Sequence, residues 1–290
     1  MEAPAIPTAM SPGVFLAVLA AAALHAGWNS FLKVKLEPFL AMTLITGAGG
    51  LAGVPLLIAF GFPRIEAFPW LIASVVIHLG YYFALTEAYR RADMGQIYPI
   101  ARGGAPLMTA ALSVGLLHEP IGLKPAFGIA VLGCGIILIA FLGRRRQAAF
   151  DPVAVGFALL PAGIVCAYTL VDGIGARIAG DPHAYSAALF VIDGIPLVLV
   201  ALWLRGLSGM APMRQFLGRG LAGGAMSLGA YWIAIWAMTV APIALVAALR
   251  ETSVLWASLI AVVFLKEPLL PARVAAAVLI VAGVVLIRLP

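Results

Sequence analysis

Two stretches of the chain, RGGAPLMTAALSVGLLHEP at positions 102–120 and RETSVLWASLIAVVFLKEP at positions 250–268, carry the same charged signature. In each stretch an arginine is followed seventeen positions later by Glu-Pro, and the two signatures lie 148 positions apart. A mainly apolar run precedes the Glu-Pro pair in both. The second half of the chain therefore repeats the first, and we predict one repeat at 1–148 and another at 149–290.

Further residues follow the same register. The offset of 148 also brings Gly135 onto Gly283, and an offset of 149 brings Tyr82 onto Tyr231. The change of offset indicates one inserted or deleted residue between the two sets of matches. Because these matches follow one register, we attribute them to a duplication of the first half of the chain and not to chance.

Composition indicates the class of protein. Hydrophobic residues make up 63% of the 290 residues and charged residues only 10%, and the mean hydropathy is +1.09. Such a chain has too little polar surface to cover a soluble globule, so we expect an integral membrane protein. Duplicated halves in a membrane protein are typical of transporters, whose binding site lies where the repeats meet.

Apolar runs long enough to cross a bilayer as a helix, roughly 20 residues, follow one another along the chain. We expect an all-α protein with ten transmembrane helices at 13–32, 38–60, 69–89, 95–117, 124–142, 153–176, 184–204, 217–239, 242–265 and 271–288. An odd number of helices per half makes the second copy enter the membrane from the opposite side. The predicted fold is therefore a pair of inverted five-helix repeats.

The basic residues predict how the chain is oriented. The net charge of +6 comes without a basic patch interleaved with aromatic residues, which argues against a nucleic-acid partner. Of the 18 lysines and arginines, twelve follow odd-numbered spans and four lie on the other side with both termini. By the positive-inside rule, both termini are expected outside the cytoplasm.

Polar side chains inside the spans carry the most functional information, because they are costly to place in a membrane. Three pairs are spaced four residues apart, so each pair shares one helix face: His25 and Asn29, His78 and Tyr82, Tyr98 and Arg102. We predict a substrate cavity lined by His25, Trp28, Asn29, His78, Tyr82, Tyr98, Arg102, Tyr231, Trp236 and Arg250. In this cavity Arg102 and Arg250 are the symmetry-related cations.

Structural roles compete with cavity lining for several of these residues. His25 can instead hydrogen-bond a neighbouring helix, and Arg102 lies near enough to the start of its span to reach the membrane interface. Arg250 needs an ion-pair partner on another helix, and Asp193 and Asp172 are the candidates. A buried ion pair would give Arg250 a structural role.

Motifs for catalysis, metals and cofactors are absent from the sequence. No Gly-rich phosphate loop precedes a lysine, and His118-Glu119 has no second histidine to complete a zinc site. Cys134 and Cys166 fall in predicted spans without metal-ligand spacing, and we interpret them as small apolar helix residues. We therefore expect no enzyme activity, no ATP-driven pump and no cofactor.

The chain resembles the drug/metabolite transporter superfamily, in its EamA-type branch of ten helices built as two repeats. The resemblance covers nearly the whole chain and is carried by His25-Ala26-Gly27-Trp28-Asn29, by Tyr98-Pro99-Ile100-Ala101-Arg102-Gly103-Gly104-Ala105-Pro106 and by the Glu-Pro pairs at Glu119 and Glu267. It implies a multi-pass protein of the bacterial inner membrane that moves metabolites. The aromatic residues of spans three and four are similar to those of aromatic amino acid exporters. Members often have a basic C-terminus that implies cytoplasmic ends, whereas this chain ends Arg288-Leu289-Pro290.

The repeat, the polar faces and the resemblance together predict a secondary transporter that exports small metabolites, above all amino acids, by alternating access. The predicted assembly is a monomer or weak homodimer in the lipid bilayer, with spans five and ten as scaffold. One alternative is a membrane enzyme acting on a lipid-linked substrate, which needs a nucleophile, base or metal cluster. A channel and a transporter of other drugs or metabolites are further alternatives.

Overall fold

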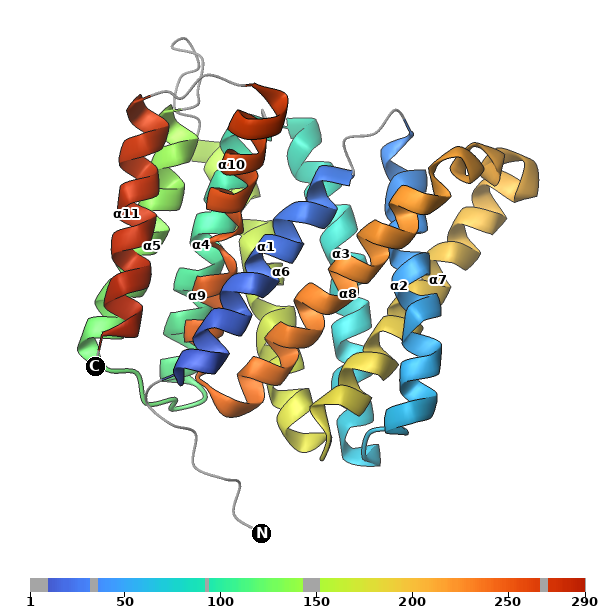
Figure 1. Cartoon of the computed structure of the whole chain (residues 1–290), viewed down its shortest axis with the longest axis horizontal. Coiled ribbons are helices and arrows are strands. Elements are labelled where there is room, and N and C mark those ends of the chain that lie inside the picture. Colours follow the sequence, from blue (N-terminus) through green and yellow to red (C-terminus); the bar gives the residue numbers. More distant parts are fainter. Residues whose placement is uncertain (1–9, 32–35, 92–93, 143–151, 267–270, 290) are drawn as a thin grey trace.

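A computed structural model describes residues 10–31, 36–91, 94–142, 152–266 and 271–289. The side chains of residues 82–91 and 94–102, and of some residues near other helix ends, lie outside this description. The described residues form helices joined by short connections and contain no strand (Figure 1). This confirms the predicted all-α membrane fold.

The helices begin and end close to the predicted spans. Their bounds are α1 (Pro12–Phe31), α2 (Pro38–Phe60), η1 (Ile65–Ala67), α3 (Phe68–Arg91), α4 (Met94–Gly115), α5 (Leu123–Leu142), α6 (Pro152–Ile178), α7 (Pro182–Met210), η2 (Ala211–Phe216), α8 (Leu217–Val240), α9 (Ile243–Arg250), α10 (Ser253–Leu265) and α11 (Pro271–Arg288). Five of these helices begin with proline, whose fixed φ and missing N–H suit the first helical position.

Among the described residues, five helical segments are long and apolar enough to cross a membrane. They are Pro12–Asn29, Pro38–Phe60, Leu159–Ile178, Pro182–Val240 and Ile243–Ile260. The segment Pro182–Val240 contains both α7 and α8. Two shorter apolar helices, Ile65–Tyr81 and Leu123–Leu138, add to them.

The prediction of one continuous helix over 242–265 is wrong, because the structure divides this span into α9 and α10. At the break, the backbone N–H groups of Glu251 and Thr252 donate to carbonyls three residues back, and the Thr252 hydroxyl donates to the Leu249 carbonyl at 2.7 Å. A threonine hydroxyl that bonds the backbone in this way competes with the α-helical pattern. The ninth span is therefore a discontinuous helix.

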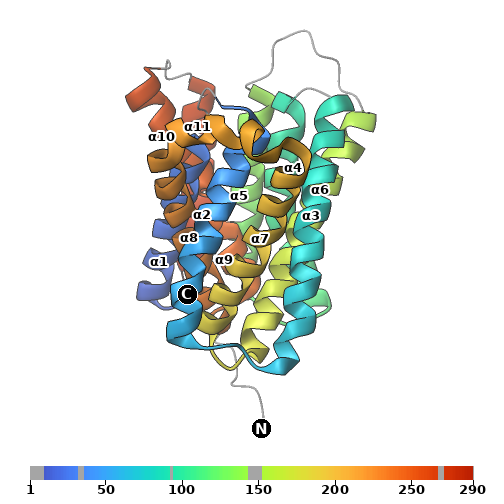
Figure 2. The same cartoon turned by 90° about the vertical axis from the view of Figure 1, so that its right-hand side faces the viewer.

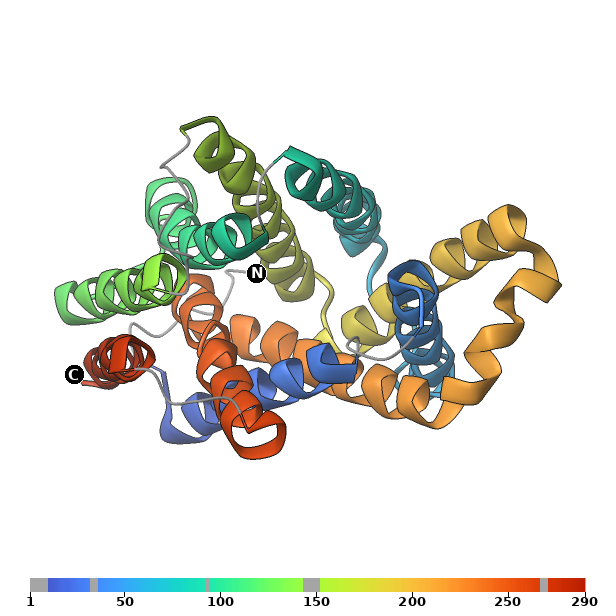
Figure 3. The same ribbon diagram turned by 90° about the horizontal axis from the view of Figure 1, so that it is seen from above.

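The two halves interlock. Helix α1 of the first half packs on α8, and its repeat counterpart α6 packs on α3. Helices α5 and α11 pair at one flank of the molecule and α2 and α7 at the other (Figures 1 and 3). The turns before Glu119 and Glu267 also match, since His118 and Lys266 both adopt a left-handed backbone with φ of 52° and 56°.

Glycines allow the closest helix contacts at the two flanks. A Cβ atom added to Gly283 of α11 would lie 2.7 Å from the Gly128 carbonyl oxygen of α5. A Cβ atom added to Gly194 of α7 would lie 2.9 Å from the Cα of Gly50 in α2. Such small-residue crossings are how membrane helices gain packing energy in lipid. They support the scaffold role predicted for spans five and ten.

The best-packed part of the molecule lies toward one end of the bundle. Helix α1 begins and α11 ends there, and we call it the terminal end (Figures 1 and 2). Nearly every residue of α9, which begins at this end, is buried, as are Met238 and Ala241 just before it. The terminal end is therefore closed around the start of α9.

Candidate functional site

Three aromatic rings from different helices meet near the middle of the bundle. The His78 ring of α3 stacks on Tyr168 of α6 with centroids 4.3 Å apart, and meets Tyr231 of α8 edge-on at 6.2 Å. The rings of Tyr168 and Tyr231 lie 6.3 Å apart. At a rise of 1.5 Å per residue, His78 lies about 15 Å from the start of α3, which is half the thickness of a bilayer core. This aromatic cluster therefore combines two residues of the predicted cavity with Tyr168, a polar residue of span six that was not in the predicted cavity set.

The Arg250 guanidinium lies over the face of the Tyr231 ring, with Cζ 4.8 Å from the ring centroid. Arg250 is the last residue of α9, where the helix dipole favours a cation. The predicted ion pair with Asp193 or Asp172 is wrong, since no ion pair of Arg250 is present among the described residues. The cation–π contact replaces it and leaves the guanidinium partly exposed.

Asp172 has a different set of partners, which explains why it does not pair with Arg250. Its carboxylate is fully buried on α6 and accepts hydrogen bonds from two phenols, Tyr185 of α7 at 3.0 Å and Tyr231 of α8. Two donors on its two oxygens satisfy the carboxylate without a cation. Asp172 therefore joins α6, α7 and α8 beneath the aromatic cluster.

Asp193 lies on α7, close enough to His78 and Asp172 for electrostatic interaction with both. It is partly exposed, unlike Asp172. Phe190 of the same helix approaches Tyr231 with centroids 6.4 Å apart. Helix α7 thus contributes an acid and an apolar ring to the site, neither of which was among the predicted site residues.

The predicted residues of α1 form their own local group. The Trp28 indole N–H lies 3.3 Å from His25 Nδ1, and the Asn29 amide donates to the His25 carbonyl at 2.7 Å. Trp236 of α8 is partly buried and packs against the hydrophobic core. The ring contacts described above for the aromatic cluster involve none of these four residues.

The side chains of three other predicted site residues, Tyr82, Tyr98 and Arg102, lie outside the described residues. Their backbones belong to α3 and α4. Tyr82 comes one helical turn after His78, so its position continues the face that carries the imidazole. The roles predicted for these three residues stay predictions.

A second polar group closes the terminal end. Glu119, in the turn after α4, is buried and accepts from Arg177 of α6 at 2.6 Å and from the Ile243 backbone N–H at 2.9 Å. Arg177 also donates to the last carbonyls of α8, those of Met238 at 2.8 Å and Ala241 at 3.2 Å. The Glu119 carboxylate thus binds the N-terminus of α9, and the Arg177 guanidinium binds carbonyls at the C-terminus of α8. Helix dipoles favour an anion at the first position and a cation at the second.

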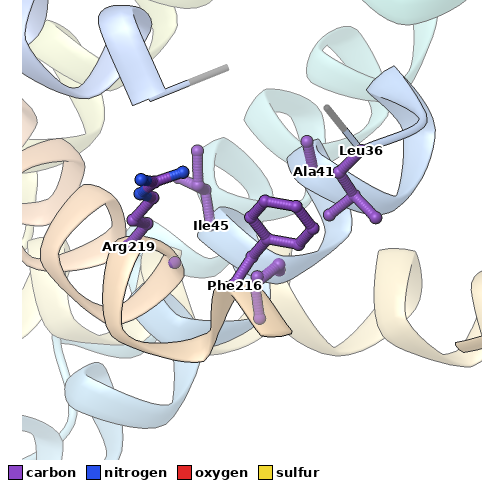
Figure 4. A pocket seen from close by; sticks show the side chains of 7 residues that line it. Leu36, Ala41, Ile45, Phe216 and Arg219 are labelled. Carbon is purple, nitrogen blue, oxygen red and sulfur yellow. The ribbon is translucent and has the colours of Figure 1, made fainter. Parts of the chain in front are cut away.

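A small surface pocket lies elsewhere, between α2 and α8. It is lined by Leu36, Ala41, Leu44, Ile45, Phe216, Arg219 and Gly220 (Figure 4). None of the predicted site residues contributes to it. Within the described part of the chain, no group of three or more His, Cys, Asp or Glu residues is placed to hold a metal ion.

Comparison with known proteins agrees with this architecture. A solved structure titled "Crystal structure of protein" superposes with a TM-score of 0.74 and 19% sequence identity, covering 97% of this chain and 98% of that chain. At this identity the likeness shows the fold alone. No curated protein sequence matches the chain.

The model of the EamA-like transporter family matches twice, over residues 11–141 and 152–289. Members of this family are multi-pass membrane transporters of small molecules. Two matches that together span nearly the whole chain show that it belongs to the EamA-like transporter family.

Proposed function

We propose that this transporter exports amino acids across the bacterial inner membrane by alternating access, with the substrate bound at the aromatic cluster. The observation that carries the proposal is the position of Arg250. Its guanidinium lies on the Tyr231 ring at the break of the ninth span, partly exposed and without an ion pair among the described residues. A partly exposed guanidinium at membrane depth can bind a substrate carboxylate through charge-assisted hydrogen bonds.

The rings around Arg250 suit an apolar side chain on the substrate. His78, Tyr168 and Tyr231 are all partly exposed and come from three helices. Substrate sites in proteins commonly combine apolar walls with a few polar groups that fix orientation. We include Tyr82, Tyr98 and Arg102 in the proposed site on the strength of their spacing.

Unequal packing between the repeats supports alternating access. Helix α8 packs along α2, whereas the repeat-related pair, α3 and α7, makes a smaller contact. Inverted repeats that adopt unequal arrangements open toward one side of the membrane, and exchanging the two arrangements opens the other side. The closed terminal end supports a state that is shut on that side.

Counterflow in liposomes tests the proposal. Purified protein should exchange labelled amino acids from a panel that includes aromatic, aliphatic and charged members. The variant Arg250→Gln should lose at least about tenfold in apparent affinity, as expected for the loss of one charge-assisted hydrogen bond. Arg205→Gln is the matched control, because Arg205 pairs with Glu37 on the exposed surface. Amino acid exchange that is absent in the wild type would refute the proposal.

A further inference from the structure

Asp193 is the acidic residue of the central region that the proposed function does not yet use. It lies eleven residues into α7, about 16 Å from the start of that helix at 1.5 Å per residue. Its carboxylate is therefore at the depth of the aromatic cluster. An ionisable group at this depth is costly and marks a functional site unless the protein itself satisfies it.

Among the described residues, Asp172 has hydrogen-bond donors and Asp193 has none. Asp172 is fully buried and accepts from the hydroxyls of Tyr185 and Tyr231. Asp193 has no hydrogen bond or ion pair with any residue that the structure describes, and it is partly exposed. The two aspartates thus differ: Asp172 is fully buried and hydrogen-bonded within the fold, whereas Asp193 is partly exposed.

Arg250 is the matching cation. It is likewise partly exposed and without an ion pair in the described part of the chain, and Tyr231 connects it to the same region. A membrane protein gains nothing from leaving one cation and one anion separately unpaired near the middle of the bilayer. A ligand that carries both charges would neutralise both.

His78 offers a further polar group at the depth of Asp193. Its Nδ1 lies 2.9 Å from the Ser74 backbone carbonyl and 3.2 Å from the Ser74 hydroxyl. When Nδ1 donates to the carbonyl, which can only accept, Nδ1 carries the ring hydrogen. In the neutral imidazole the other nitrogen, Nε2, is then an acceptor. A carboxylate and an imidazole acceptor together suit a primary ammonium group, which offers three donors.

We propose that Asp193 binds the positively charged amino group of the substrate, so that the transported molecule is a zwitterion held between Asp193 and Arg250. This inference rests on the proposed function and assigns the second ionic contact of the same site. It distinguishes α-amino acids from two close chemical relatives. A deaminated acid leaves Asp193 unpaired, and a decarboxylated amine leaves Arg250 unpaired.

Wild-type protein gives the first test. Counterflow of labelled phenylalanine should be inhibited by unlabelled phenylalanine at least about tenfold more strongly than by phenyllactate or phenethylamine, because each analogue leaves one of the two site charges without its counter-charge. Equal inhibition by all three compounds would overturn the role of Asp193 while leaving amino acid transport intact. If the wild type does not transport any amino acid, the proposed function fails together with this inference.

Variants give the second test. Asp193→Asn should weaken inhibition by phenylalanine at least about tenfold and leave inhibition by phenyllactate unchanged or stronger. Asp181→Asn is the control, since Asp181 is on the same helix but caps its first turn by accepting from the His183 N–H at 2.8 Å. Equal weakening for both compounds in Asp193→Asn would show a structural role. If this variant does not remain monodisperse, the wild-type ratios alone decide.

Discussion

The carboxylate of Glu119 and the guanidinium of Arg177, which are 58 residues apart in the sequence, form an ion pair of 2.6 Å at the terminal end. The Glu119 side chain is 2% exposed and that of Arg177 is 20% exposed. Both groups also bind backbone at the connection between α8 and α9. One pair of side chains therefore holds four elements of the bundle together.

Breaking this pair should destabilise the protein. Removing one partner of a buried ion pair costs about 3 to 5 kcal/mol, because the other charge is left unpaired. Arg177→Gln should therefore lower the midpoint of thermal unfolding in detergent clearly. Glu37→Gln is the control, because Glu37 and Arg205 are 43% and 46% exposed and such pairs contribute about 0 to 1 kcal/mol. Equal midpoints for the two variants would show that the Glu119–Arg177 pair contributes little.

Loss of the pair should also shift which side of the protein is open. A single cysteine at Met238, which is fully buried, should be unreactive toward a membrane-impermeant thiol reagent from the terminal side. In Glu119→Gln it should become reactive, since the ion pair that closes this end is lost.

A second single cysteine distinguishes opening of the terminal end from a general loosening of the fold. Ser227 lies one helical turn before Tyr231 on α8 and is partly exposed, so a cysteine there reports on access from the opposite side. In Glu119→Gln its reactivity should fall as that of position 238 rises. A rise at both positions would mean that the fold has loosened and that the pair does not control access.

The crossing of α5 and α11 should tolerate no side chain at Gly283. A Cβ atom there would approach the Gly128 carbonyl and the Leu132 backbone nitrogen to 2.7 Å, and backbone atoms cannot move aside cheaply. We expect Gly283→Ala to lower the yield of monodisperse protein and its unfolding midpoint. Gly13→Ala is the matched control, because an added Cβ meets nothing within 4 Å. Indistinguishable variants would contradict the close crossing.

The orientation of the chain can be measured with topology reporters. If the distribution of basic residues governs insertion, a reporter fused after Pro290 should behave as extracytoplasmic and one inserted at Arg145 as cytoplasmic. The first described helix begins and the last ends at the same end of the bundle (Figure 1). The reverse pattern would overturn the orientation without affecting the fold.

The fold could be predicted from the sequence because the apolar spans and the repeat are both visible in the order of residues along the chain. The offset that relates Arg102 to Arg250 also relates His118 to Lys266, and the structure gives the latter two the same left-handed backbone. Helical spacing selected His78 and the repeat offset selected Tyr231, and these two residues meet at the cluster.

The missed features depend on contacts between helices. Asp172 was interpreted as a partner for Arg250, but it is satisfied by the phenols of Tyr185 and Tyr231, and no periodicity within one helix reveals that. The bonds of Arg177 to the Met238 and Ala241 carbonyls, at the end of α8, likewise join separate helices. At the break after Arg250 the Thr252 hydroxyl donates to the Leu249 carbonyl, and the length of an apolar run does not reveal such a local bond.

The central claim is that the face of α3 at His78 lines the substrate cavity, and the accessibility of that position tests it most directly. Cys134 and Cys166 are first replaced by alanine, and a single cysteine is introduced at His78. The account predicts that a water-soluble thiol reagent modifies this cysteine, and that saturating phenylalanine slows the modification several-fold. A cysteine that does not react, or that reacts equally fast with and without every transported amino acid, would contradict the account and place the site elsewhere.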